Sequence, residues 1–478
     1  MTAFLALCFV ASNLGIFQVF AIGSMGVTPL EFTIMIFMLV VPLWMVWTGT
    51  PLRVPRGPEI TVMVLLLASM TVSAISPVFY ADSLRMVQSF KTLTHFIFLW
   101  SFGVVLWCIP VKPRAWIDAL RLHLGVSIAI CLFGAYQIVA RALDLPLAWI
   151  DITNTSFIKG QMQHNELGQL SLQFANLFRA TSIFSEPSAL ATYSSINIAL
   201  LVIPIFRGSK GILHTRWVQV LAIVSALIAL LLAFSLTGLM LTGAVMLLAM
   251  ILYRKAAWKR VAVVVALSTV VIGIADRVVE SYAGVSVVEL FAMRVGSIIT
   301  GKAKSGESGT MIGESLTQRT GDYAASIEVW KESPLLGVGP GNFANSNFGR
   351  AYSSPYPATT YGTVISEMGV VGIAVFSVFL LVLFGRLLMT ERQWTKLHLG
   401  DGSDLERLAP ILPFILLITI FVGLTGNLLV SAYWWLFFAF VLNVHSELRR
   451  SMGEDTSVRV RIVRAGLRDR WRGALQWL

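Results

Sequence analysis

The stretch KESPLLGVGPGNF, residues 331–343, differs from the rest of the chain. A charged run ends at Pro334 and gives way to three glycines and a second proline within seven residues, 335–341. Such a backbone cannot cross lipid, because its N–H and C=O groups would have no internal partners there. The stretch therefore predicts a turn outside the membrane, placed between a helix and the next span.

The composition indicates a polytopic α-helical membrane protein. Of the 478 residues, 56% are hydrophobic and 13% are charged, and the mean hydropathy is +0.77. This balance excludes a soluble globular enzyme. The formal net charge of +11 is spread over clusters between apolar runs, which argues against a nucleic-acid partner. Cys8, Cys108 and Cys131 lie inside apolar runs, without disulfide or metal-ligand spacing.

Apolar runs of spanning length predict an all-α bundle of about twelve transmembrane helices in one domain, residues 1–445. The runs are 3–22, 30–48, 60–78, 90–109, 122–141, 188–206, 217–234, 237–253, 261–276, 363–386, 409–425 and 428–445. Basic clusters alternate with basic-poor connections, so both termini are expected in the cytoplasm. Two long connections, 144–187 and 277–362, then lie on the periplasmic side, and residues 446–478 form a basic cytoplasmic tail.

The structures of two further segments can be predicted from their sequences. Residues 217–253 form either one long helix or two short ones around the sequence SLTG. Because both flanks are strongly basic, an even number of crossings is needed, and we expect a tight hairpin. Farther along, Tyr323, Ile327 and Trp330 are spaced for an amphipathic helix that Pro334 ends.

Three segments outside the apolar runs concentrate polar and charged groups. They are residues 80–95 with Arg85 and Lys91, residues 178–195 with Arg179 and Glu186, and the segment from Arg319 and Asp322 to Arg350 and Glu367. A reaction that would use this layout is transfer of a sugar chain from a lipid pyrophosphate. Arginines bind phosphate oxygens bidentately and stay charged, and a carboxylate would act as general base. Glycine turns let backbone N–H groups approach sugar or phosphate oxygens.

Each of these groups also has a structural alternative. Arg319 and Asp322 are spaced i, i+3 on a helix and would pair with each other. Glu186 stands at a helix start, where a carboxylate interacts with the helix dipole. Arg85 and Lys91 would anchor a helix at the lipid headgroups, and the glycine turn would only connect two elements.

Three motifs resemble the bacterial O-antigen polymerase and O-antigen ligase superfamily, which includes exopolysaccharide repeat-unit polymerases. WKESPLLGVGPGNF (330–343) is similar to the family's hallmark after its large periplasmic helix. FRATSIFSEPSALA (178–191) resembles the Arg-to-Glu-Pro segment of the exopolysaccharide polymerases. AFSLTGLMLTG (233–243) resembles a Ser-x-x-Gly turn before a span, although family members often carry an arginine where this chain has Leu236-Thr237.

The resemblance implies a membrane-embedded glycosyltransferase fold in the bacterial inner membrane. It implies transfer of undecaprenyl-pyrophosphate-linked glycans at the periplasmic face, without nucleotide sugar, metal or another cofactor. The further partners expected are membrane lipids, a chain-length regulator and a flippase, with no nucleic acid.

The family's functional residues are arginines of the periplasmic loops, and the matching positions are Arg179 and Arg319. We expect these two to bind the pyrophosphates and Glu186 to act as base or to orient the acceptor, with Asp322 and Glu367 open as alternative bases. The expected further substrate contacts are Arg85, Lys91, Asp322, Gly339, Gly341, Asn342, Arg350 and Glu367.

One departure from the family bears on the reaction. Ligases commonly carry a His-Asn pair shortly before the element that reads SEMGVVG (366–372) here, and this chain has Ala358-Thr359 instead. The missing histidine favours a repeat-unit polymerase over a ligase that moves finished glycan to another acceptor. A transporter or flippase of lipid-linked sugar is the alternative from another class, which the scarcity of charge within the spans disfavours.

Overall fold

The computed structural model describes residues 1–22, 25–80, 82–154, 169, 173–174, 177–284, 286–289, 291–292, 314–350, 357, 359–398, 402–454 and 458–460. Parts of both long predicted connections and most of the predicted tail lie outside these residues. The helices are α1 (Thr2–Ala11), α2 (Pro29–Thr48), α3 (Pro58–Ile75), α4 (Ser83–Cys108), α5 (Pro113–Ala142), α7 (Pro187–Arg207), α8 (Arg216–Leu232), α9 (Leu236–Ala283), α11 (Glu314–Glu332), α12 (Thr360–His398), α13 (Asp404–Leu408), α14 (Leu412–Val422) and α15 (Ala432–Ser451).

The described strands form three antiparallel two-stranded ribbons beside an all-α bundle. The pairs are β1 (Phe20–Ile22) with β2 (Met25–Val27), β3 (Leu52–Val54) with β6 (Val458–Val460), and β4 (Gln173–Phe174) with β5 (Leu177–Phe178). The predicted all-α class is therefore confirmed.

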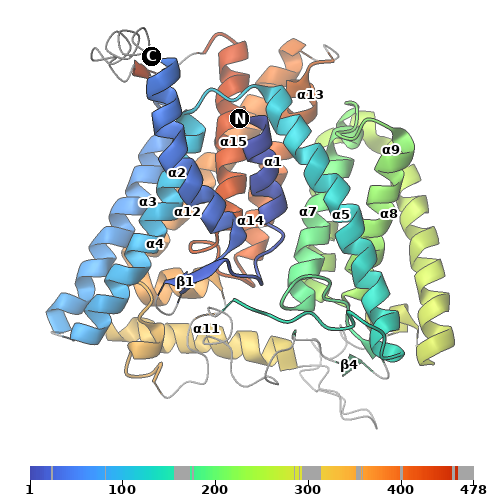
Figure 1. Ribbon diagram of the computed structural model, residues 1–478, viewed down its shortest axis with the longest axis horizontal. Helices are drawn as coiled ribbons and strands as arrows, with labels where there is room; N and C mark the ends of the chain where they lie inside the picture. Colours follow the sequence, from blue (N-terminus) through green and yellow to red (C-terminus); the bar gives the residue numbers. More distant parts are fainter. Residues whose placement is uncertain are drawn as a thin grey trace, which may run out of the picture.

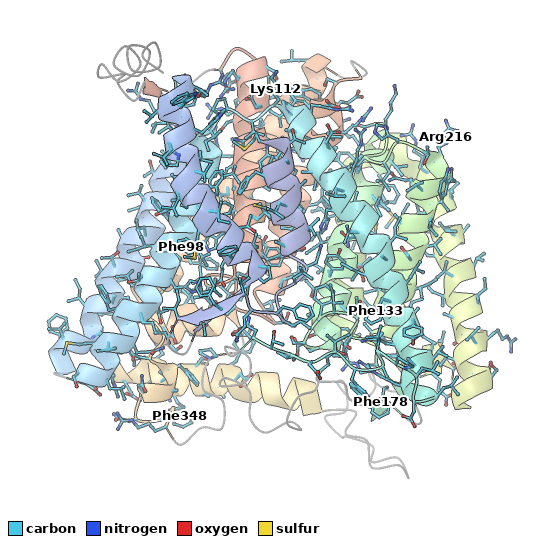
Figure 2. All side chains as sticks on the ribbon, viewed as in Figure 1. Phe98, Lys112, Phe133, Phe178, Arg216 and Phe348 are labelled. Carbon is cyan, nitrogen blue, oxygen red and sulfur yellow. The ribbon has the colours of Figure 1, made fainter. Side chains whose placement is uncertain are left out.

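The long helices run along the bundle, and α11 lies across one of its ends (Figure 1). Phe178 and Phe348 lie at this α11 end, whereas Lys112 and Arg216 lie at the opposite end (Figure 2). The N-terminus is also at the opposite end (Figure 1). The N-terminus, Lys112 and Arg216 thus share one end of the bundle, as expected if basic connections lie on one side of the membrane.

The core lies among α7, α14 and α15, and the outer helices carry apolar side chains on their exposed faces. In the most apolar 18-residue stretch of α7, 83% is buried, whereas the corresponding share in α2 is 28%. On α2, Leu39, Leu43 and Trp47 are 70%, 71% and 76% exposed. Because water would disfavour so many exposed apolar groups, these faces suit a lipid environment.

Nine helices in the described part of the chain are long and apolar enough to cross a membrane. The expected number of twelve is not confirmed, although every predicted run overlaps a helix. The run 3–22 contains only the ten-residue α1, because the chain leaves the helix near Asn13 and Gly15. The predicted hairpin is confirmed, since α8 and α9 are separated by the turn at residues 233–235. Tyr253 then breaks α9 with φ −112° and ψ 19°, and its second half lies at the outer edge of the bundle (Figure 1, yellow-green).

The predicted helix before Pro334 is confirmed as α11, which ends at Glu332, but its predicted apolar face is wrong. The buried face contains Ala325 and Val329, whereas Ile327 is 44% exposed. Ala325 and Val329 cluster with Val338 and Phe343 of the segment that follows. The helix packs its small side chains on this segment, which leaves the larger ones at its edge.

The glycine-rich segment from Pro334 to Phe343, the glycine turn, completes an interruption in α12. Gly369 breaks α12 with φ +66° and ψ −162°. After the break, the N–H groups of Val370 and Val371 donate to the carbonyls of Pro334 (2.9 Å) and Leu335 (3.2 Å). A helix end inside a membrane protein must find such partners for its backbone groups.

The residues before the break bond to the same turn. Val338 N–H donates to Ser366 O (3.0 Å), and Gly339 N–H donates to Glu367 O (3.1 Å). From α3, Ser73 Oγ donates to Leu336 O (2.7 Å), and Ser76 Oγ donates to Gly337 O (2.7 Å). The turn is thus fixed by two helices that are far apart in the sequence.

We expect Gly369→Ala to destabilise the protein, because its backbone conformation is almost restricted to glycine and costs another residue about 1–3 kcal/mol. The added Cβ would also lie 2.4 Å from Leu335 O. Gly385→Ala is the matched control, since Gly385 lies in the same helix and a Cβ added there would have no other group within 4 Å. Thermal unfolding of the two detergent-solubilised variants is the measurement. Equal unfolding temperatures would contradict this account of the break.

Candidate functional site

One buried carboxylate holds the glycine turn. Glu367 is 4% exposed, its Oε2 accepts from Gly341 N–H (2.7 Å), and its Oε1 accepts from Phe343 N–H (3.4 Å). The two oxygens of one side chain thus hold the backbone on both sides of Asn342. Glu367 was expected to contact substrate or act as base, and the structure instead uses its carboxylate to fix the turn.

Asn342 ties the same turn to α4. Its side chain is fully buried, and Nδ2 donates to Arg85 O (2.9 Å) and Ser89 Oγ (2.7 Å). Its Oδ1 accepts from Asn345 Nδ2 (3.0 Å). An amide with three short internal bonds has little capacity left for a substrate, so Asn342 is a structural link.

The N–H groups of Gly339 and Gly341, expected to approach a substrate, also bond within the protein. Both donate to Glu367, the first to its carbonyl and the second to its carboxylate. A Cβ at Gly339 would lie 2.6 Å from Ser89 Oγ, and one at Gly341 would lie 2.2 Å from Thr92 Oγ1. These glycines are needed because α4 approaches the turn so closely.

Charged residues surround the turn at the surface. Arg85 is 5% exposed; its Nε donates to Asn345 O (3.0 Å), and its guanidinium pairs with Asp82 (3.3 Å) and Glu332 (3.7 Å). Arg350 also pairs with Asp82 (3.6 Å), but its side chain is 58% exposed. Of these two arginines, Arg350 is therefore the one that a ligand at the surface can reach.

Three further predicted residues lie near this region. Lys91 is half-buried on α4, and Asp322 is 3% exposed on the inner face of α11. The backbone of Arg319 lies in α11, but its side chain is outside the described part of the structure. The expected pairing of Arg319 with Asp322 is therefore untested.

A second polar group surrounds Arg179 and includes Arg141, which the sequence analysis missed. Arg179 is 5% exposed, and its Nε donates to Ala233 O (2.9 Å) just beyond α8. Arg141 donates to Gln169 Oε1 (3.0 Å), to Thr181 Oγ1 (2.6 Å) and to the carbonyl of Arg179. An arginine at the end of an apolar span is rare. Its position was visible in the sequence, but its burial and its partners were not.

Glu186 follows this group at the start of α7. It is the N-cap residue of the helix, it is half-buried, and one carboxylate oxygen accepts from Ser188 Oγ. Asp322 and Glu367 are only 3% and 4% exposed. Among the three candidate bases, Glu186 is the one whose carboxylate is partly accessible.

A pair of titratable residues on the polar side of α4 was also missed. His95 Nε2 lies 2.9 Å from Glu31 Oε1, and Glu31 also caps α2 through Thr28. Arg85, Ser89 and Thr92 precede His95 at helical spacing and face the turn, so α4 carries a polar stripe. The spacing was visible in the sequence, whereas Glu31, 64 residues away, was not an evident partner.

The two groups lie at the same end of the molecule but on different sides of it. Phe348, whose N–H donates to Glu332 Oε1, marks the first group, and Phe178, next to Arg179, marks the second (Figure 2). Among the described residues, no group of three or more His, Cys, Asp and Glu could hold a metal ion.

We expect Glu367→Gln to destabilise the protein although the side chain keeps its size. A glutamine must turn its NH₂ toward either Gly341 N–H or Phe343 N–H, and a buried donor without an acceptor costs about 1–3 kcal/mol. Glu328→Gln is the control, because Glu328 on α11 is 45% exposed and pairs with Lys331. The measurement is the unfolding temperature, and an unchanged value for Glu367→Gln would show that the carboxylate does not hold the turn.

Comparison with known proteins identifies part of the chain. The sequence model of the O-antigen ligase family matches residues 221–377. The matched region runs from α8 into α12 and contains α11, the glycine turn, Arg350 and Glu367. The resemblance to the O-antigen polymerase and ligase superfamily is thereby confirmed. No curated protein matches the chain.

Proposed function

We propose that this chain, whose residues 221–377 match the O-antigen ligase family, polymerises lipid-linked oligosaccharide repeat units. The donor would be a growing glycan on undecaprenyl pyrophosphate, and the acceptor would be the terminal sugar of a new lipid-linked unit. The reaction would take place at the periplasmic face of the inner membrane, on the α11 end. The family match supports a multi-pass membrane enzyme that transfers glycosyl groups, and the polymerase activity is our inference from there.

The observation that carries the proposal is the position of the glycine turn within the matched region. The turn is bonded to both halves of α12 and to α3, and it packs against α11. Transfer from a lipid pyrophosphate depends on groups that are held in place before the charge on the leaving group develops. The turn supplies a rigid support for α11, which carries Arg319, and for the adjacent Arg350.

We assign the roles of Arg350 and Glu186 by their exposure, and those of Arg319 and Arg179 by the resemblance of their motifs. Arg319 and Arg350 would bind the pyrophosphate, since guanidinium groups match phosphate oxygens and keep their charge. Arg179, which belongs to the second polar group and lies close in sequence to Glu186, would also bind a pyrophosphate. Glu186 would be the base, because a general base must reach the acceptor hydroxyl, and its side chain is partly exposed.

A ligase is the second candidate, since the matching family is described as O-antigen ligase. The two reactions differ in what a deletion strain accumulates. Loss of a polymerase leaves single lipid-linked repeat units, whereas loss of a ligase leaves long glycans on the lipid carrier. Long lipid-linked polymer in the deletion strain would overturn the polymerase proposal.

We expect Arg350→Ala to shorten the polymer in a complemented deletion strain. Loss of a hydrogen bond to a charged group costs about 1.5–3 kcal/mol, which slows transfer roughly tenfold or more. Lys331→Ala is the matched control, because Lys331 has the same exposed fraction, 58%, and lies at the same end. The measurement is glycan chain length at equal membrane abundance. Equal shortening by both substitutions would indicate a general charge effect and contradict the role of Arg350.

Glu186→Gln tests the base in the same strain. The substitution keeps the size of the side chain and its acceptor for Ser188 but removes the ability to take a proton, so only single lipid-linked units are expected. Glu328→Gln, which changes an exposed carboxylate on α11, should leave long polymer. Normal chain length in Glu186→Gln would exclude this residue as the base.

A further inference from the structure

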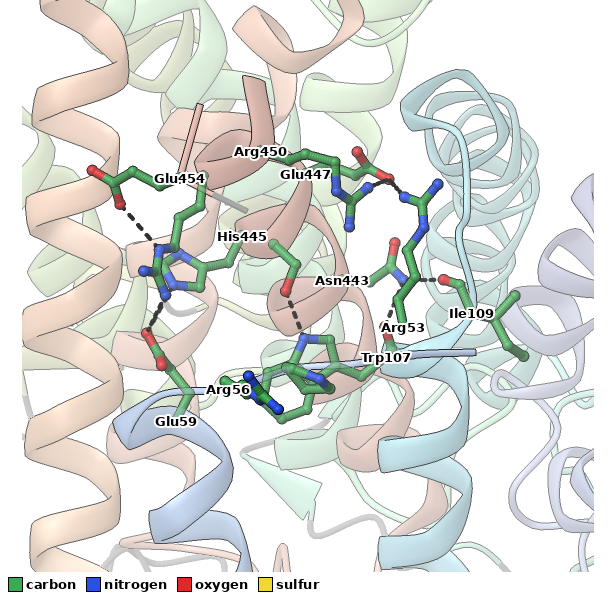
Figure 3. A pocket seen from close by; sticks show the side chains of 13 residues that line it. Arg53, Arg56, Glu59, Trp107, Ile109, Asn443, His445, Glu447, Arg450 and Glu454 are labelled. Carbon is green, nitrogen blue, oxygen red and sulfur yellow. Dashed lines mark hydrogen bonds and ion pairs between the residues drawn. The ribbon is translucent and has the colours of Figure 1, made fainter. Parts of the chain in front are cut away.

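A pocket lined by arginines is formed by residues of α3, α4 and α15 and of the segments beside them (Figure 3). Ile109 of its lining is close in sequence to Lys112, which lies at the end of the bundle opposite α11 (Figure 2). Its lining residues are Arg53, Pro55, Arg56, Glu59, Trp107, Ile109, Asn443, His445, Ser446, Glu447, Arg449, Arg450 and Glu454. The proposed transfer reaction uses none of them.

The charges of the pocket are not balanced. Glu447 accepts from Arg450 (2.6 Å) and pairs with Arg53 (3.5 Å). Glu59, 2% exposed, pairs with Arg449 (3.6 Å) and with Arg386 (2.8 Å), which lies just outside the lining residues. With Arg56 and Glu454 included, five arginines face three carboxylates, which leaves an excess of positive charge.

Several donors of the pocket are not used within the described part of the chain. Arg450 Nε is buried and has no hydrogen-bond partner there. Arg56 is exposed and has no ion-pair or hydrogen-bond partner among the described residues. Buried donors normally have partners, so Arg450 Nε points to a ligand that accepts hydrogen bonds, and the exposed Arg56 can donate to the same ligand.

We propose that this pocket binds the phosphate group of an anionic ligand. Arg56 and Arg450 would donate to its oxygens, because guanidinium groups bind phosphate bidentately. The position at the ends of the spans fits the phosphate of an anionic lipid headgroup, and a free phosphate offers the same oxygens. Trp107, whose Nε1 donates to Ser446 Oγ (2.7 Å), also lines the pocket, and tryptophans are common at membrane interfaces.

The test uses the full-length protein in detergent at constant ionic strength. A ligand that binds the folded state raises the unfolding temperature as its concentration increases. The probes are inorganic phosphate and, separately, mixed micelles that contain phosphatidylglycerol or phosphatidylcholine. Stabilisation of the wild type by phosphate and by phosphatidylglycerol, or by phosphatidylglycerol alone, supports the site, and the second pattern assigns it to a lipid headgroup. Stabilisation by neither overturns the proposal.

Arg56→Ala should raise the ligand concentration needed for half-maximal stabilisation about tenfold, as expected for the loss of one good phosphate contact. Arg216→Ala is the matched control, because Arg216 is an exposed arginine at the same end and outside the pocket. Arg450→Lys keeps the charge beside Glu447 but removes the Nε donor, and it should also weaken binding. The proposed site is wrong if the ligand stabilises Arg56→Ala and Arg216→Ala as it does the wild type. It is also wrong if both variants lose this stabilisation equally. The readout does not depend on glycan transfer.

Discussion

The interruption of α12 at Gly369 is the constraint on which the α11 end of this protein depends. A helix broken at the edge of the membrane leaves backbone groups that water cannot reach easily. The glycine turn satisfies them, with bonds to Val370 and Val371 on one side of the break and to Ser366 and Glu367 on the other. Because the turn continues directly from α11, the position of α11 across the bundle follows from these bonds.

The bundle and the α8–α9 hairpin could be predicted from the lengths of the apolar runs and from the basic flanks that require an even number of crossings. Both features depend on length and composition. Length and composition did not predict the break at Gly369, since hydropathy does not depend on φ and the apolar run 363–386 continues across the break. The prediction of which face of α11 is buried was wrong for a related reason. The helix packs on a turn and not on lipid, so small residues such as Ala325 face inward and Ile327 does not.

For the candidate site, the sequence identified segments rich in polar groups but not how each polar group is used. Asn342, Gly339 and Glu367 have the chemistry of substrate contacts, yet their hydrogen bonds are made inside the protein. Whether a donor is already occupied depends on a partner elsewhere in the chain, which sequence spacing does not contain. The same limit explains why Arg141 was missed, because its partners come from loops up to 40 residues away.

The distribution of basic residues indicates which side of the membrane the proposed reaction faces. The N-terminus, Lys112 and Arg216 share the end that also holds the arginine-lined pocket, and α11 lies at the other. Positively charged connections are retained in the cytoplasm, so we infer that α11 faces the opposite side. On that side, Arg350 is exposed beside a turn that has no spare N–H groups at Gly339 and Gly341. Recognition of a pyrophosphate there would therefore depend on arginine side chains supported by the turn, and not on the turn itself.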